Sequence, residues 1–342
     1  MKTLSFLLAG ATLLLASHSP AQTKYYYSPD NNAASGSTNA IPFGTGSTTW
    51  ADQRGQFLVR STYLPSSPGL VKSLGFAPGY GGTFLYEAMV INLGFNTTGS
   101  LGANFRNNFK GQPLTVLNRF DFSWPVTANQ WNRIPLERPF IYNGQDNLVV
   151  EIFATGSDRN NKGVSFRTGS EPRAYLYNNT PTAAIRTFGQ GCKGSSGKVP
   201  AMEIRSYPLI GATLFEVGLQ QAPASAPALL FLGNSNTAFA GLPLPFDLVG
   251  IGAPGCPLNA SILAQVGGAA GAGGELVLNL PIPDSSALES AVFYGQWAMV
   301  DGAANPAGLT TTAGLEVTTG SVTPATGRTS SNAGLKIEVG IL

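Results

Sequence analysis

The chain of 342 residues contains a single histidine, His18. It lies in an N-terminal stretch that begins with Lys2, continues with the apolar run Leu4–Ala16 and ends with the small residues Ser19 and Ala21. This is the three-part pattern of a secretory signal peptide, so we expect residues 1–21 to be removed. The mature chain would then contain no imidazole, which excludes a Ser-His-Asp or Cys-His hydrolase and a His-ligated zinc or copper site.

Paired carboxylates could still act without histidine, because a glycosidase needs only two Asp or Glu side chains about 5 to 10 Å apart. The candidates in the N-terminal half are Glu87, Asp121, Glu137, Asp146 and Glu151. On an outward strand face these would be ordinary solvated residues, and no second catalytic motif accompanies them. We therefore predict that the protein is not an enzyme and keep a histidine-free carboxylate-pair glycosidase as an alternative.

Aromatic residues in the N-terminal half are the better candidates for contact with a ligand. Exposed Trp and Tyr rings offer flat faces to sugar rings, and neighbouring cations can add polar contacts. The alternative is that these rings fill the core of a β-sandwich. The candidate binding residues are Trp124, Trp131 and Tyr142, with Arg133 and Arg138 as polar partners.

Motifs for a metal or a cofactor have little support. Two Gly-x-Gly-x-x-Gly matches begin at Gly189 and Gly250, but neither lies between a strand and a helix, as a dinucleotide site requires. The stretch 158–163, Asp-Arg-Asn-Asn-Lys-Gly, offers oxygen ligands for calcium but lacks a downstream bidentate Glu. We predict no cofactor and no catalytic metal, with calcium at 158–163 as the alternative.

The two cysteines, Cys192 and Cys256, form an even pair in a chain that we expect to be exported. A bridge between them would close a loop of about 64 residues and stabilise the fold by about 4 kcal/mol. A redox-active pair is disfavoured because no Cys-x-x-Cys is present. We predict a structural disulfide.

Composition predicts a β-rich fold of two units. Gly and Pro are frequent, with 42 and 24 residues, while charged residues make up only 11%. Short alternating strands between Gly- and Pro-rich turns recur along the chain. Gln22–Ser206 has 17 basic and 10 acidic residues, whereas Tyr207–Leu342 has 2 and 8, an asymmetry typical of separate domains. We predict an all-β protein with a jelly-roll sandwich at 22–180, a linker at 181–200 and a second, jelly-roll or Ig-like sandwich at 201–342.

Several segments from Phe188 to Thr319 form an ordered series: Phe-Gly-Gln-Gly-Cys at 188–192, Leu-Leu-Phe-Leu-Gly at 229–233, Gly-Ala-Pro-Gly-Cys at 252–256 and Phe-Tyr-Gly-Gln-Trp at 293–297. The series resembles the C-terminal module of a large group of secreted planctomycete-type bacterial proteins. The resemblance implies an exported β-sandwich accessory module with a Cys192–Cys256 bridge. The chain departs from that pattern after Thr319.

The N-terminal half resembles the jelly-roll modules of secreted bacterial surface proteins more loosely. The resemblance is carried by Ile-Pro-Phe-Gly at 41–44, Arg-Gly-Gln-Phe at 54–57, Pro-Phe-Ile-Tyr-Asn-Gly at 139–144 and Asn-Leu-Val-Val-Glu-Ile at 147–152. It implies binding and not catalysis.

Together these features predict a secreted or cell-surface interaction module with a polysaccharide or another surface protein as its partner. The basic residues are scattered, which is not the pattern of a nucleic-acid interface. No apolar run after the N-terminus approaches the ~18 residues of a membrane span. The alternative is a self-associating structural subunit, in which Thr23–Ser28 and Leu335–Leu342 add as strands to a neighbouring sheet.

Overall fold

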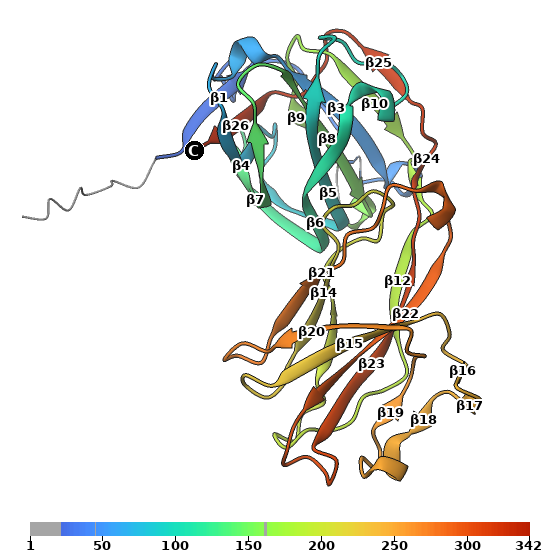
Figure 1. Ribbon diagram of the computed structural model, residues 1–342. Helices are drawn as coiled ribbons and strands as arrows, with labels where there is room; N and C mark the ends of the chain where they lie inside the picture. The colour runs from blue at the N-terminus through green and yellow to red at the C-terminus, as the bar shows by residue number, and fades with distance from the viewer. Residues whose placement is uncertain (1–21, 45, 161–162) are drawn as a thin grey trace, which may run out of the picture.

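The computed structural model describes residues 22–44, 46–160 and 163–342, and the expected signal peptide lies outside these residues. Within them the fold is all-β, with only short 3₁₀ helices between the strands, which confirms the predicted class. None of the described helices is long and apolar enough to cross a membrane. The sheets gather into two bodies, one above the other in Figure 1.

The first body consists of two antiparallel sheets that face each other across one core. Alternate apolar residues point inward from both sheets, among them Phe57, Tyr86, Val150, Ile134 and Val339. One sheet has the order β1 (Lys24–Ser28), β26 (Ile337–Ile341), β4 (Gly69–Phe76) and β7 (Asn132–Tyr142). The other has the order β25 (Arg328–Ser330), β10 (Arg173–Tyr177), β3 (Gln53–Val59), β8 (Asn147–Thr155), β5 (Gly82–Asn96) and β6 (Lys110–Val126).

The end of the chain belongs to this first body, contrary to the predicted second unit at 201–342. Strand β26 lies between β1 and β4 and pairs antiparallel with both, so the C-terminus lies beside β1 (Figure 1). Leu335, Ile337, Val339 and Ile341 are buried in the first core. In the structural-subunit alternative, Thr23–Ser28 and Leu335–Leu342 add to a neighbouring sheet. In the structure they pair with each other, and Leu335–Leu342 also pairs with β4, within the chain.

The second body is built from a five-stranded and a three-stranded sheet around a core that contains Trp297, Leu230 and Phe215. The larger sheet has the order β12 (Ala184–Phe188), β23 (Leu309–Thr318), β22 (Val292–Val300), β15 (Pro227–Gly233) and β20 (Ala264–Ala269). The smaller has the order β13 (Ala201–Ile204), β14 (Glu216–Gln220) and β21 (Leu276–Asn279). The predicted linker at 181–200 is thus partly wrong, since β12 is an edge strand of the larger sheet.

The remaining elements are short. Paired strands outside the main sheets are β2 (Thr38–Asn39) with β9 (Phe166–Arg167), β11 (Thr180–Pro181) with β24 (Val322–Thr323), β16 (Ala238–Phe239) with β17 (Leu242–Pro243), and β18 (Phe246–Asp247) with β19 (Pro257–Leu258). The 3₁₀ helices are η1 (Thr48–Trp50), η2 (Ser61–Tyr63), η3 (Arg106–Asn108), η4 (Ser157–Arg159), η5 (Leu248–Ile251) and η6 (Ser286–Leu288).

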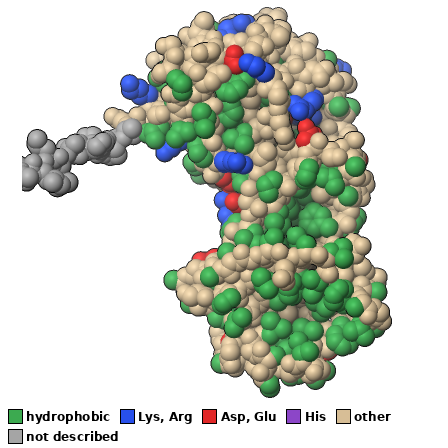
Figure 2. Space-filling model, viewed as in Figure 1, with side chains coloured by type: hydrophobic (Ala, Val, Ile, Leu, Met, Phe, Trp, Pro, Cys, Tyr) green, Lys and Arg blue, Asp and Glu red, His purple; other side chains and the backbone are tan. Residues whose placement is uncertain are grey.

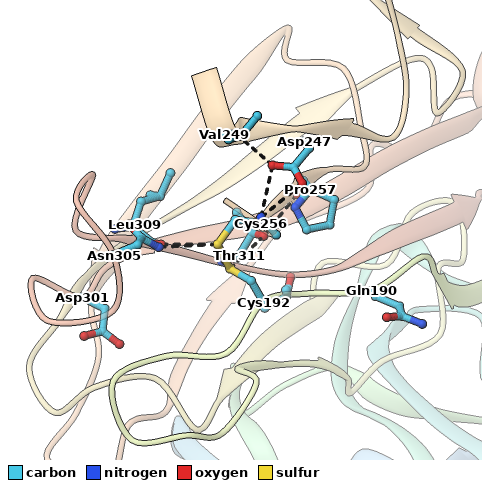
Figure 3. The surroundings of a disulfide bond; sticks show 12 residues. Gln190, Cys192, Asp247, Val249, Cys256, Pro257, Asp301, Asn305, Leu309 and Thr311 are labelled. Atoms are coloured by element: carbon cyan, nitrogen blue, oxygen red, sulfur yellow. Dashed lines mark hydrogen bonds between the residues drawn. A yellow bond between two sulfur atoms is a disulfide. The ribbon is translucent and has the colours of Figure 1, made fainter. Parts of the chain in front are cut away.

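The disulfide joins two glycine-rich turns of the second body, as predicted. The Cys192 and Cys256 sulfurs are bonded, and both residues are buried against Ala253 (Figure 3). The backbone N–H of Thr311 donates to the Cys192 sulfur, and the Asn305 amide donates to the Cys256 sulfur. The bridge thereby fastens the β18–β19 hairpin and the turn before β13 to strand β23.

The two bodies meet in a buried contact centred on Asn118 of β6. Its side-chain amide donates to the carbonyls of Tyr207 and Leu214 and accepts the N–H of Tyr207. A small apolar cluster that includes Ala88, Val90 and Phe153 on the outer face of the first body packs against Tyr207 beside it. Because buried polar groups are costly when unpaired, this satisfied set of bonds holds the two bodies in one orientation.

Alkaline pH should weaken this contact through Tyr207. Its hydroxyl donates to the Ala183 carbonyl, and burial, followed by the charges of Glu87 and Asp52, raises the pKa of Tyr207 well above the usual value. The folded state keeps the proton after the unfolded chain has lost it, so stability present below pH ~10 falls as the pH rises toward the folded pKa. We expect Tyr207→Phe to reduce the loss of unfolding free energy between about pH 10 and 11 by about 1 kcal/mol. Urea unfolding of the wild type and the variant at several pH values measures this difference. If the unfolding free energy of both proteins fell equally steeply with pH, the prediction would be contradicted.

Candidate functional site

A crease on the first body, between β6 and β7, is the candidate binding site. The two strands follow each other in the chain, but β6 is the edge of one sheet and β7 is the edge of the other. The turn between them therefore crosses the open side of the sandwich, where the side chains of both edges line a cavity of about 400 Å³. We refer to this cavity as the β6–β7 crease.

The floor of the crease is apolar because both strands alternate between core-facing and outward-facing residues. Leu117, Trp124 and Ile134 are buried in the first core and contribute to the lining. Phe122 and Leu136 are half-buried and form the part of the floor that a ligand could touch. A floor of this kind can accept the C–H face of a sugar or another flat apolar group.

Charged side chains surround that floor. Arg119 of β6 pairs with Glu137 of β7 across the crease, and the backbone N–H of Asn118 donates to the same carboxylate at 3.2 Å. Burial raises the pKa of Glu137 even though the hydrogen bond from Asn118 and the charge of Arg119 oppose the rise. Asp121, at the exposed end, pairs with Arg159 at 2.8 Å. The crease thus combines an apolar floor with both donors and acceptors at its rim.

Arg133 also lines the crease, but its charge is already engaged. Its guanidinium donates two hydrogen bonds to Glu338 of β26, at 2.5 and 2.9 Å, and lies over the Tyr25 ring. Glu338 is fully buried, so this pair compensates a charge inside the first body. The pKa of Arg133 is raised, mainly because its guanidinium is hydrogen-bonded to the Glu338 carboxylate.

The structure brings only two of the five predicted contact residues, Trp124 and Arg133, to the crease. Trp124 is 5% exposed and stacks on Phe166, so it is mainly a core residue and not the exposed platform that we expected. Tyr142 is fully buried beside Phe95, which corrects its assignment as a contact residue, because a buried ring cannot reach a ligand.

The other two predicted residues lie elsewhere on the first body. Trp131 is half-buried, contacts the Tyr27 ring and donates its indole N–H to the Asn31 carbonyl. Arg138 is exposed and donates to the Thr213 carbonyl at the contact with the second body. Both have structural partners, so the five predicted residues do not form one site.

Sequence reasoning missed Arg119 and Phe122 as crease residues. By sequence, Arg119 and Asp121 are expected on one face of the strand, and Phe122 and Trp124 on the other. This pattern indicates two faces but not which of them borders β7. Of the predicted carboxylates, Asp121 and Glu137 line the crease, and the other three do not.

A second cavity, of about 320 Å³, lies where the outer face of the first body meets the second body. Its most buried charged group is Glu151 of β8, which accepts hydrogen bonds from Arg54, Gln56 and Asn92 at 2.7 to 2.9 Å. Three of these hydrogen bonds go to Oε1 and one, from Asn92, goes to Oε2. Because Arg54 compensates the buried charge and donors from adjacent strands hold both oxygens, the arrangement supports a structural role for Glu151.

The predicted calcium loop gives no sign of a metal site among the residues that the structure describes. Residues 161 and 162 lie outside them. The Asn160 side chain is engaged with the backbone of Leu85 and Ser157, so its oxygen accepts the Leu85 N–H. No group of three or more His, Cys, Asp or Glu suited to a metal occurs within 22–44, 46–160 and 163–342.

No protein-family model matches the chain, and no curated protein is significantly similar to it.

Proposed function

We propose that the protein is a secreted, non-catalytic interaction module whose β6–β7 crease binds a polysaccharide. In this proposal the first body is a jelly-roll binding domain, and the second is an accessory sandwich that displays it outside the cell. The observation that carries the proposal is the crease itself, where a partly exposed apolar floor is enclosed by an Arg–Glu pair and further charged groups.

The chemistry of this crease fits a sugar better than a purely apolar ligand. A sugar ring has an apolar C–H face and a polar edge of hydroxyl groups, which matches a floor of Phe122 and Leu136 beside Arg119 and Glu137. The Arg119 guanidinium has donors left beyond the nitrogen that contacts Glu137. Glu137 supplies acceptor oxygens beside Arg119 at the same floor.

Charge favours an acidic polysaccharide. The first body, residues 22–183 and 319–342, has 15 basic and 10 acidic residues, whereas residues 184–318 have 4 and 8. A positive excess raises the local concentration of an anionic chain and speeds its encounter with the crease. A buried disulfide in the second body agrees with an oxidising, extracellular location.

Removing the floor or the cation of the crease should weaken glycan binding. We expect Phe122→Ala and Arg119→Met each to reduce the affinity about tenfold, because each removes one of the two kinds of contact. A glycan array with acidic and neutral polysaccharides identifies the ligand, and isothermal titration calorimetry with the best oligosaccharide measures the affinities.

Two matched variants test whether the effect belongs to the crease. Ile141→Ala removes a 68% exposed side chain from the same strand β7, outside the crease, and should bind like the wild type. Trp131→Ala should also bind like the wild type if the crease is the site. Equal binding by Phe122→Ala and the wild type, or a lack of any glycan ligand, would reject the proposal. Chromatography of the titrated sugar would reveal cleavage, which a binding module does not produce.

A further inference from the structure

Strand β20 is an unprotected sheet edge. It is the outer strand of the five-stranded sheet of the second body, and all six of its residues, Ala264–Ala269, are exposed. Its sequence, Ala-Gln-Val-Gly-Gly-Ala, contains no charged residue and no proline. Edge strands are normally protected by lysine, proline, a bulge or a covering segment, because their free backbone groups can pair with another strand.

The pairing of β20 with β15 determines which backbone groups are free. Ala270 donates its N–H to the Ala226 carbonyl, and Pro227, which has no N–H, lies opposite Ala269. Since the direction of the backbone groups alternates along an antiparallel strand, those of Gln265, Gly267 and Ala269 point away from β15. The free edge therefore presents three regularly spaced pairs of donors and acceptors.

The surroundings of this edge carry very little charge. No Lys, Arg, Asp or Glu occurs between Asp247 and Glu275. Ten of the sixteen large hydrophobic side chains that are exposed lie between residues 184 and 318. Figure 2 shows the same contrast, with few charged side chains visible on the second body. Two copies of this edge can therefore approach each other without bringing like charges together.

We propose that β20 pairs antiparallel with β20 of a second copy of the chain, about a two-fold axis at Gly267. In this register Gly267 lies opposite Gly267 of the second copy, and Gln265 lies opposite Ala269 of the second copy. All three outward-facing residues then fall in hydrogen-bonded pairs, each of which exchanges two bonds. Two-fold registers centred elsewhere leave at least one outward-facing residue without a partner.

Side chains beside the edge support this register. Leu263 is 70% exposed and precedes β20 directly. In the proposed pairing it lies opposite Gly271 of the second copy, within the glycine-rich turn 271–274, which has little side-chain bulk to exclude it. The two five-stranded sheets would join into one continuous sheet, a self-complementary arrangement typical of two-fold dimers.

Sedimentation velocity of residues 22–342 over a range of concentrations tests the proposal. The contact is small, so we expect a weak dimer with a Kd on the order of 0.1 mM. Gln265→Lys combined with Ala269→Lys places like charges opposite each other and should raise the Kd by about fivefold or more. Gln265→Lys combined with Ala269→Glu places opposite charges there and should restore or tighten the dimer.

Amide hydrogen exchange locates the contact independently. The amides of Gln265, Gly267 and Ala269 should gain protection as the protein concentration rises, while those of Ala264 and Val266, already paired with β15, should stay protected throughout. A chain that remains monomeric at about 1 mM overturns the proposal. So does a dimer whose Kd the charge variants do not change, which would place the interface elsewhere. Because the test needs no glycan, its failure is distinct from failure of the proposed function.

Discussion

Deletion of residues 333–342 should unfold the first body, although most of that body is built from residues 22–183, far away in the sequence. The deletion removes β26 from the middle of a four-stranded sheet and exposes the facing edges of β1 and β4. It also removes the buried side chains of Leu335, Ile337, Val339 and Ile341. Truncating one such side chain to Ala costs about 2 to 5 kcal/mol, so losing four approaches or exceeds the ~5 to 15 kcal/mol by which a typical domain is stable.

Near-ultraviolet circular dichroism and thermal unfolding measure this effect, because many aromatic residues are packed in the first core. The single variant Val339→Ala should destabilise the protein by about 2 to 4 kcal/mol while keeping the native spectrum. Thr329→Ala in the exposed edge strand β25 serves as the control from the same tail. If the truncated chain kept the native spectrum and the wild-type melting temperature, β26 would not be required for the stability of the first body, and the prediction would be wrong.

Loss of the disulfide should have the second largest effect. The bridge closes a loop over a sequence separation of 64 residues, and removing such a restraint from the unfolded chain costs about 4 kcal/mol. We expect Cys192→Ala combined with Cys256→Ala to lower the unfolding free energy by about this amount. Denaturant unfolding in the absence of reductant measures the difference.

Reduction of the wild-type protein provides the matched comparison. Dithiothreitol should shift the wild-type unfolding curve toward that of the double variant and leave the variant unchanged. The loss should be concentrated in the second body, where the bridge fastens the β18–β19 hairpin beside β23 (Figure 3). A double variant as stable as the oxidised wild type would show that the hairpin is held by its other contacts alone.

The pattern of residues along the chain predicts only part of the candidate site. Alternation separates buried from outward-facing residues only from Asp121 to Val126 of β6, since Thr115–Asn118 are all buried. It does not indicate which strand lies beside them. Trp124 is a candidate for a flat sugar-binding surface by residue type, but its position on β6 directs it into the core, which was the alternative for these aromatic residues. The partner of Arg133 is Glu338, which is 205 positions away in the chain, a separation that no local pattern can reveal.

The amino-acid sequence by itself determined the all-β class and the disulfide. Frequent glycine and proline set the turns, two-residue alternation set the strands, and two cysteines allow only one intramolecular pairing. Tertiary structure decided the rest: the return of β26 to the first body, the crease formed by the edges of two sheets, and the unprotected edge at β20. The physical reason is that strand propensity and alternation are local, whereas strand pairing joins residues far apart in the chain and depends on how whole sheets pack.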